Sequence, residues 1–176
     1  GPSAPERVAT TDFIHDAARR AAERGLSFYL LGATEESNAA AAARLAALYP
    51  GLVVAGRRHG YFDLEAAAPI VEDINRSRAD VVWVALGVPR EHRFILANRE
   101  RFTHAAWVKS CGGCFDFLSE KVARAPGWMQ KLGLEWSFRL AQEPRRLFWR
   151  YAITNPQAVM LMCRQMWTDR RRGPPA

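Results

Sequence analysis

The sequence has 176 residues, 49% of them apolar and 24% charged, and this ordinary globular composition excludes a wholly disordered chain. The formal net charge of +7 is unevenly spread, because residues 1–120 carry −1 and residues 121–176 carry +8. This split argues against a uniformly basic nucleic-acid coat. It predicts a neutral domain over residues 1–120 and a basic, aromatic helical appendage over residues 121–176.

Helices and strands alternate in the predicted order of elements. Apolar residues at helical spacing predict helices over residues 10–24, 35–49, 65–77 and 90–101. Short apolar runs predict strands over residues 28–31, 52–55, 81–86 and 105–109, the second of them ended by Gly56. Apolar strands that alternate with helices are typical of a parallel sheet covered on both faces, so the expected fold is α/β and Rossmann-like. Ligands bind such folds beyond the carboxyl ends of the strands.

The loop after the first predicted strand contains Gly32 and Thr34. Backbone N–H groups at the start of the next helix could hold a phosphate there. The alternative is an ordinary strand–helix turn with a threonine cap, and the sequence does not decide between the two.

The loop after the second strand contains Gly60 and Tyr61, followed by Phe62. Either aromatic ring could stack on a nucleobase, and Tyr61 is the preferred candidate because Phe62 fits a buried anchor that closes the loop. His59, without a partner in the motif, is more typical of a structural hydrogen bond than of catalysis.

Gly87 and Pro89 follow the clearest strand and precede two charged residues at a helix start. Their position favours binding, with Arg90 on a diphosphate and Glu91 on ribose or sugar hydroxyls. The alternative is that both side chains belong to a solvated helix cap.

The last loop of the predicted sheet contains Gly113 and Asp116. A carboxylate at this position could bind hydroxyl groups or act as a base, and the alternative is a local cap. Cys111 and Cys114 have C-x-x-C spacing, for which two small residues packed in a turn are favoured over a metal or redox pair. The odd total of three cysteines indicates a reducing compartment.

Residues 121–176 interleave aromatic and basic side chains, and Pro156 is predicted to begin a last helix. The region could bind single-stranded nucleic acid, lie on an anionic membrane, or form helices with a solvated cationic face. The cluster of Met, Leu and Trp before the final arginines favours the membrane. The residues assigned to membrane or acceptor binding are Arg124, Trp128, Arg139, Arg145, Arg146, Arg150, Trp167, Arg170, Arg171 and Arg172. No run of 18 or more apolar residues is present.

Five segments carry motifs in a characteristic order: residues 30–32, 59–62, 87–90, 113–117 and 124–151. Together they resemble the WecG/TagA/CpsF glycosyltransferase family, and the resemblance extends from about residue 6 through the basic region. It implies an inverting enzyme that moves a sugar from a UDP-sugar to a polyprenyl-diphosphate-linked acceptor in bacterial cell-surface or exopolysaccharide synthesis. The implied location is cytoplasmic, on the inner face of the plasma membrane.

The resemblance also sets expectations about catalysis. The family's usual N-terminal segment, with its proposed base, has no counterpart here, and residues 1–3 look like a protease-cleavage remnant. We therefore expect the general base in that segment, with Asp116 as the alternative. The chain has no Asp-x-Asp motif, so neither a metal nor a cofactor is expected.

The expected partners are the donor, the lipid-linked acceptor and an anionic membrane surface, not nucleic acid, and a homo-oligomer is left open. The alternative function is a non-catalytic homologue that binds a nucleotide-sugar or a lipid.

Overall fold

A computed structural model describes residues 9–172, except for the side chains of residues 131, 146, 150, 151 and 168–172. The chain divides into two compact units, residues 1–123 and 124–176. The assignment of the first to nucleotide-sugars and of the second to a membrane stays a prediction.

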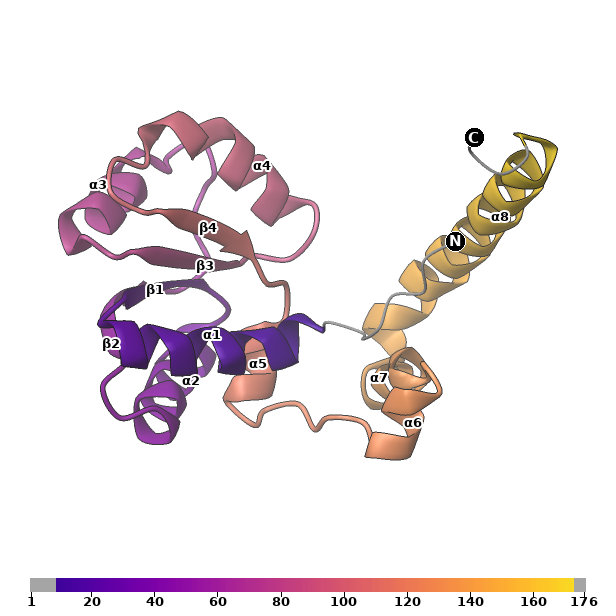
Figure 1. The fold of residues 1–176 in the computed structure, drawn as a ribbon, viewed down its shortest axis with the longest axis horizontal. Coiled ribbons are helices and arrows are strands. Elements are labelled where there is room, and N and C mark those ends of the chain that lie inside the picture. The colour runs from indigo at the N-terminus through magenta and orange to yellow at the C-terminus, as the bar shows by residue number, and fades with distance from the viewer. Residues whose placement is uncertain (1–8, 173–176) are drawn as a thin grey trace. The chain divides into compact units, whose positions relative to one another are not determined.

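The first unit is a four-stranded parallel sheet with helices on both faces (Figure 1). The strands, in the spatial order β2-β1-β3-β4, are β2 (Val53–Arg58), β1 (Ser27–Gly32), β3 (Val81–Ala85) and β4 (Trp107–Ser110). The helices are α1 (Thr10–Arg24), α2 (Glu35–Leu48), α3 (Ala68–Ser77), α4 (Arg90–Asn98), the 3-10 turn η1 (Arg99–Arg101) and α5 (Cys114–Leu118). The predicted α/β, Rossmann-like fold is confirmed.

Each face of the sheet carries its own apolar core. On one face, α1, α2 and α5 pack against Phe28, Leu30 and Trp83. On the other, α3 and α4 pack against residues that include Leu31 and Tyr29. The alternation of neighbouring side chains between faces follows from the period of two in a strand, and burial on both faces explains why β3, and β1 after Ser27, carry hydrophobic residues and glycine.

The predicted end of the second strand at Gly56 is wrong, because β2 continues to Arg58. Gly56 pairs with Tyr29 of β1, next to an irregularity in the strand register. A Cβ atom at position 56 would lie 2.6 Å from the Tyr29 ring, so glycine makes room for that ring instead of stopping the strand. The Tyr29 hydroxyl donates a hydrogen bond to Asp73, and burial raises the pKa of Tyr29 well above its ordinary value.

The second unit contains the helices α6 (Gly127–Lys131), α7 (Glu135–Gln142) and α8 (Pro144–Arg172). The predicted helix start at Pro156 is wrong, because Pro156 lies inside the continuous 29-residue α8. Proline removes one backbone N–H and so frees the carbonyl group one turn earlier, at Ala152. Ala152 is exposed, so water can satisfy that carbonyl and the helix continues. Among the described residues, no helix is long and apolar enough to span a bilayer.

Candidate functional site

The four parallel strands end at one edge of the sheet, and the loops that follow them meet there. This edge brings together the glycine-bearing loops that the sequence singled out, with Gly32 and Thr34 after β1, Gly60 and Tyr61 after β2, Gly87 and Pro89 after β3, and Gly113 after β4. Hydrogen bonds between side chains and backbone groups of these loops run across the sheet.

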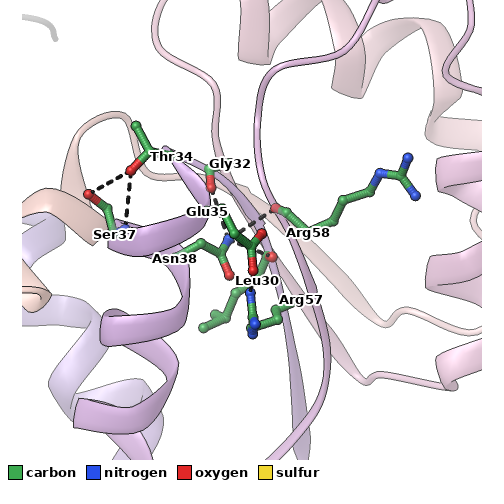
Figure 2. Close-up of polar contacts among 8 residues, drawn as sticks. All are labelled: Leu30, Gly32, Thr34, Glu35, Ser37, Asn38, Arg57 and Arg58. Carbon is green, nitrogen blue, oxygen red and sulfur yellow. Dashed lines mark hydrogen bonds and ion pairs between the residues drawn. The ribbon is translucent and has the colours of Figure 1, made fainter.

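Asn38, on α2, ties the ends of β1 and β2 together and was missed by the sequence analysis (Figure 2). Its side chain is fully buried, and its Nδ2 atom donates to the carbonyl oxygens of Leu30 (3.0 Å), Gly32 (2.9 Å) and Arg58 (3.0 Å). Three acceptors around one amide nitrogen fix which end of the side chain is the donor. The sequence offered one signal for a buried role of Asn38, which is that this amide residue directly precedes the alanine run at residues 39–43.

Thr34 is the N-cap of α2, as one of the two sequence interpretations expected. Its Oγ1 atom accepts a hydrogen bond from the backbone N–H of Ser37 at 3.2 Å (Figure 2). Glu35 in the same turn pairs with Arg57 of β2. One backbone N–H group at this helix start is therefore already hydrogen-bonded, and the Glu35 carboxylate nearby would repel a phosphate. The geometry favours the capping interpretation.

Backbone contacts close the space between the loops after β1, β2 and β3. The Ala33 N–H donates to the Ala85 carbonyl oxygen at 3.0 Å, and the Gly60 N–H donates to the Ala33 carbonyl oxygen at 2.8 Å. Gly32 has φ +131°, and a Cβ atom there would lie 2.2 Å from the Ala85 oxygen. Glycine is thus required at position 32 by close backbone approach.

The loop after β2 separates its two aromatic residues. Tyr61 is 71% exposed and available to a ligand. Phe62 is partly buried and packs on Phe94 of α4, with 5.9 Å between the ring centroids, as expected for an anchor. The His59 Nδ1 atom accepts from the Tyr61 backbone N–H at 3.2 Å, which agrees with the structural role expected for this histidine.

Arg90, in the first turn of α4, is held against the loop after β2. Its Nη2 atom donates to the Phe62 carbonyl oxygen, and its guanidinium lies 5.1 Å from the centroid of the Phe62 ring. Within the described part of the chain, the buried Nε atom of Arg90 has no hydrogen-bond partner. A fixed, incompletely paired guanidinium at the carboxyl edge is suited to an anionic group.

Glu91 is 2% exposed, so the alternative of a solvated cap does not hold for this residue. Its Oε2 atom accepts from the backbone N–H groups of Gly87 at 3.2 Å and Gly112 at 3.0 Å. A carboxylate can be buried at low cost when such donors surround it. The sequence motif could not reveal these two hydrogen bonds, because the second donor, Gly112, lies in a loop 21 residues further along the chain.

The loop after β4 buries both cysteines of the C-x-x-C sequence. Cys111 and Cys114 form no disulfide and are buried in the apolar core, as expected for packed small residues. Burial raises the pKa of Cys111 well above its ordinary value, so this thiol is held in its unreactive form. Asp116 lies within the first turn of α5 and is partly buried. No group of three or more His, Cys, Asp or Glu suited to a metal ion occurs among the residues that the structure describes.

The residues assigned to the membrane or acceptor differ in their surroundings. Arg124 pairs with Glu135 at 3.5 Å, and Arg139 pairs with Glu143 at 3.3 Å, so both arginines form ion pairs within the second unit. Arg145 is exposed, as are the large side chains of Trp128 and Trp167. The side chains of Arg146, Arg150, Arg170, Arg171 and Arg172 lie outside the described part of the structure.

Comparisons with known proteins identify a family and a curated relative. A model of the glycosyl transferase WecG/TagA/CpsF family matches residues 1–172. The chain is 30% identical over 159 residues to the N-acetylglucosaminyldiphosphoundecaprenol N-acetyl-beta-D-mannosaminyltransferase of Bacillus subtilis (strain 168). The match covers 90% of this chain and 60% of the relative's length.

Proposed function

The chain belongs to the WecG/TagA/CpsF glycosyltransferase family, and from this premise we propose that it transfers a sugar from a UDP-sugar to a polyprenyl-diphosphate-linked acceptor. The relative from B. subtilis is named as an N-acetyl-beta-D-mannosaminyltransferase that acts on N-acetylglucosaminyldiphosphoundecaprenol, an acceptor of this kind. The placement of Arg90 at the carboxyl edge of the sheet is the observation that most supports this function for the chain itself.

The proposed reaction is an inverting displacement. An acceptor hydroxyl attacks the anomeric carbon of the donor and gives its proton to a base, while the bond from that carbon to the diphosphate oxygen breaks and UDP leaves with the electron pair. Negative charge grows on the leaving diphosphate, and a positioned guanidinium lowers the energy of that state. Arg90 takes this role, the exposed Tyr61 ring stacks on the uracil, and Asp116 binds hydroxyls or acts as the base.

The first test is UDP binding to the full-length protein and to its Arg90→Ala variant. We expect micromolar to millimolar binding of UDP by the wild type. The variant should bind about 10- to 100-fold more weakly, about 1.5–3 kcal/mol, because a hydrogen bond to a charged group is lost. Isothermal titration calorimetry measures both affinities. Arg93→Ala is the matched control, since Arg93 is exposed on the same helix and its substitution removes the same charge.

Equal weakening by Arg90→Ala and Arg93→Ala would show that only the general positive charge of α4 matters. Turnover with a panel of UDP-sugars and lipid-linked acceptors then separates an enzyme from a homologue that binds nucleotide-sugars without reaction.

We further propose that α8 attaches the protein to an anionic membrane surface where the acceptor resides. Large apolar side chains that are more than half exposed follow one another along this helix, among them Trp149, Met160, Leu161, Met166 and Trp167. Apolar side chains inserted at the interface and arginines at the headgroups are the two contributions that hold a peripheral helix on a bilayer.

Sedimentation with vesicles containing about one-third anionic phospholipid tests this attachment. We expect the wild-type protein to sediment, and 0.5 M salt to reduce the bound fraction because it screens the arginines. The double variant Leu161→Gln, Trp167→Gln should lose most binding, whereas Gln157→Ser, an exposed change on the same helix, should not. A chain ended after residue 151 that sediments as well as the wild type would contradict the role of α8.

A further inference from the structure

We propose that Glu91 is a positioning residue for the donor site, which clamps two glycine loops together and does not bind donor hydroxyls. The inference rests on the proposed function, because it concerns the same donor site. It replaces the hydroxyl-binding role that the sequence pattern suggested for this residue.

The clamp consists of one oxygen atom and two loops. Glu91 lies in the first turn of α4, and its Oε2 atom accepts from Gly87 N–H, after β3, and from Gly112 N–H, after β4. These strands are neighbours in the sheet, so the carboxylate spans the gap between their loops. With the side chain 2% exposed, little of it is left to meet a ligand.

The clamp matters because the two glycines have no side-chain packing of their own, although backbone hydrogen bonds such as Glu91 N–H to the Gly87 carbonyl oxygen lie nearby. Gly87 and Gly112 have φ +77° and +54°, and within the described residues nothing lies within 4 Å of a Cβ atom built on either one. Glycine in an open position gains no support from side-chain contacts and has much conformational freedom to lose. Two charge-assisted hydrogen bonds to a buried carboxylate supply the missing restraint.

The carboxylate also decides where an anion can bind. Two backbone N–H groups that converge on one oxygen would otherwise form a small anion site, and the Glu91 side-chain oxygen fills it. A diphosphate is therefore directed away from the gap between these loops and toward Arg90. Because Arg90 precedes Glu91 in the same helical turn, fixing Glu91 also fixes the start of the helix that carries the guanidinium.

The decisive experiment compares UDP with 2′,3′-dideoxy-UDP, which lacks the ribose hydroxyls. For Glu91→Ala in the full-length protein, we expect at least tenfold weaker binding of both nucleotides by the same factor. Glu91→Gln should stay within about threefold of the wild type, because the amide oxygen has the same reach and accepts the same hydrogen bonds. His92→Ala, an exposed neighbour in the same turn, is the matched control and should leave both affinities unchanged.

A loss for UDP without a loss for the dideoxy nucleotide would overturn the proposal and make Glu91 a ribose ligand. Unchanged affinity for both nucleotides in Glu91→Ala would also overturn it.

Amide hydrogen exchange at Gly87 and Gly112, followed by NMR, tests the clamp without any nucleotide. We expect slow exchange in the wild type and in Glu91→Gln, and at least tenfold faster exchange at both glycines in Glu91→Ala. Unchanged exchange in Glu91→Ala would overturn the clamp itself. Absence of UDP binding by the wild-type protein would instead overturn the proposed function, and with it the donor-site role of Glu91, so the two failures are distinguishable.

Discussion

Replacing Gly32 with alanine is expected to destabilise the first unit by at least about 3 kcal/mol, enough to remove much of a typical domain's stability. A Cβ atom at this position would lie 2.2 Å from the Ala85 carbonyl oxygen and 2.4 Å from its carbon. Both are backbone atoms of a central strand, so neither can move without breaking the pairing of β1 with β3. The value of φ, +131°, adds strain of its own for any residue with a side chain.

Urea denaturation of Gly32→Ala beside Gly25→Ala measures this effect. Gly25 ends α1 with φ +66° and has nothing within 4 Å of a Cβ atom, so its substitution isolates the conformational strain, about 1 kcal/mol. If the free energy of unfolding fell by the same amount in both variants, the close approach of Gly32 to Ala85 would make no contribution to the effect of Gly32→Ala.

Replacing Asn38 with aspartate is expected to destabilise the fold by about 3 kcal/mol or more at neutral pH. The amide nitrogen that donates to three carbonyl oxygens would become a carboxylate oxygen, which repels all three in a fully buried place. Burial and the facing carbonyls would raise the pKa of the new carboxyl group in the folded state above its unfolded value. The loss of stability relative to the wild type should therefore be largest above that raised pKa. It should become smaller as the pH falls toward about 4, where the protonated carboxyl group can again donate a hydrogen bond.

Denaturation curves at pH 7 and pH 4 test both parts of this expectation. Asn98→Asp is the matched comparison, because Asn98 is also buried but its Nδ2 atom donates to one carbonyl oxygen, that of Phe94, and its Oδ1 atom accepts from Arg101, an interaction that a carboxylate keeps. A loss of stability in Asn38→Asp that is no larger than in Asn98→Asp, or that does not depend on pH, would contradict the proposed importance of the three hydrogen bonds from Asn38.

The fold could be read from the sequence to a large extent because its signals are local. Buried parallel strands show as apolar runs, and their glycine-bearing ends mark the edge at which folds of this class bind ligands. Gly56 was misread because a glycine that makes room for the Tyr29 ring looks the same in sequence as one that ends a strand. Pro156 was misread because the rule that proline starts a helix does not consider whether water can reach the freed carbonyl group.

The candidate site was predictable in its position but not in its contacts. Gly87, Arg90 and Glu91 were placed correctly at a strand end, yet the sequence could not show that Glu91 turns inward to meet Gly112. The role of Asn38 could not be predicted, because no local pattern around an amide residue in an alanine-rich helix reveals three acceptors on other segments. Contacts between segments far apart in the chain depend on the strand order, which local patterns do not encode.

The strand order has one more consequence. In the order β2-β1-β3-β4, the chain runs outward in opposite directions from β1 and β3, and the gap between such strands is where open α/β sheets receive their ligands. Here the hydrogen bond from Ala33 to Ala85 seals that gap with main chain. A nucleotide bound as we propose would therefore lie on top of this main-chain contact and not between the two strand ends, and its recognition would depend on side chains above the contact, such as Tyr61 and Arg90.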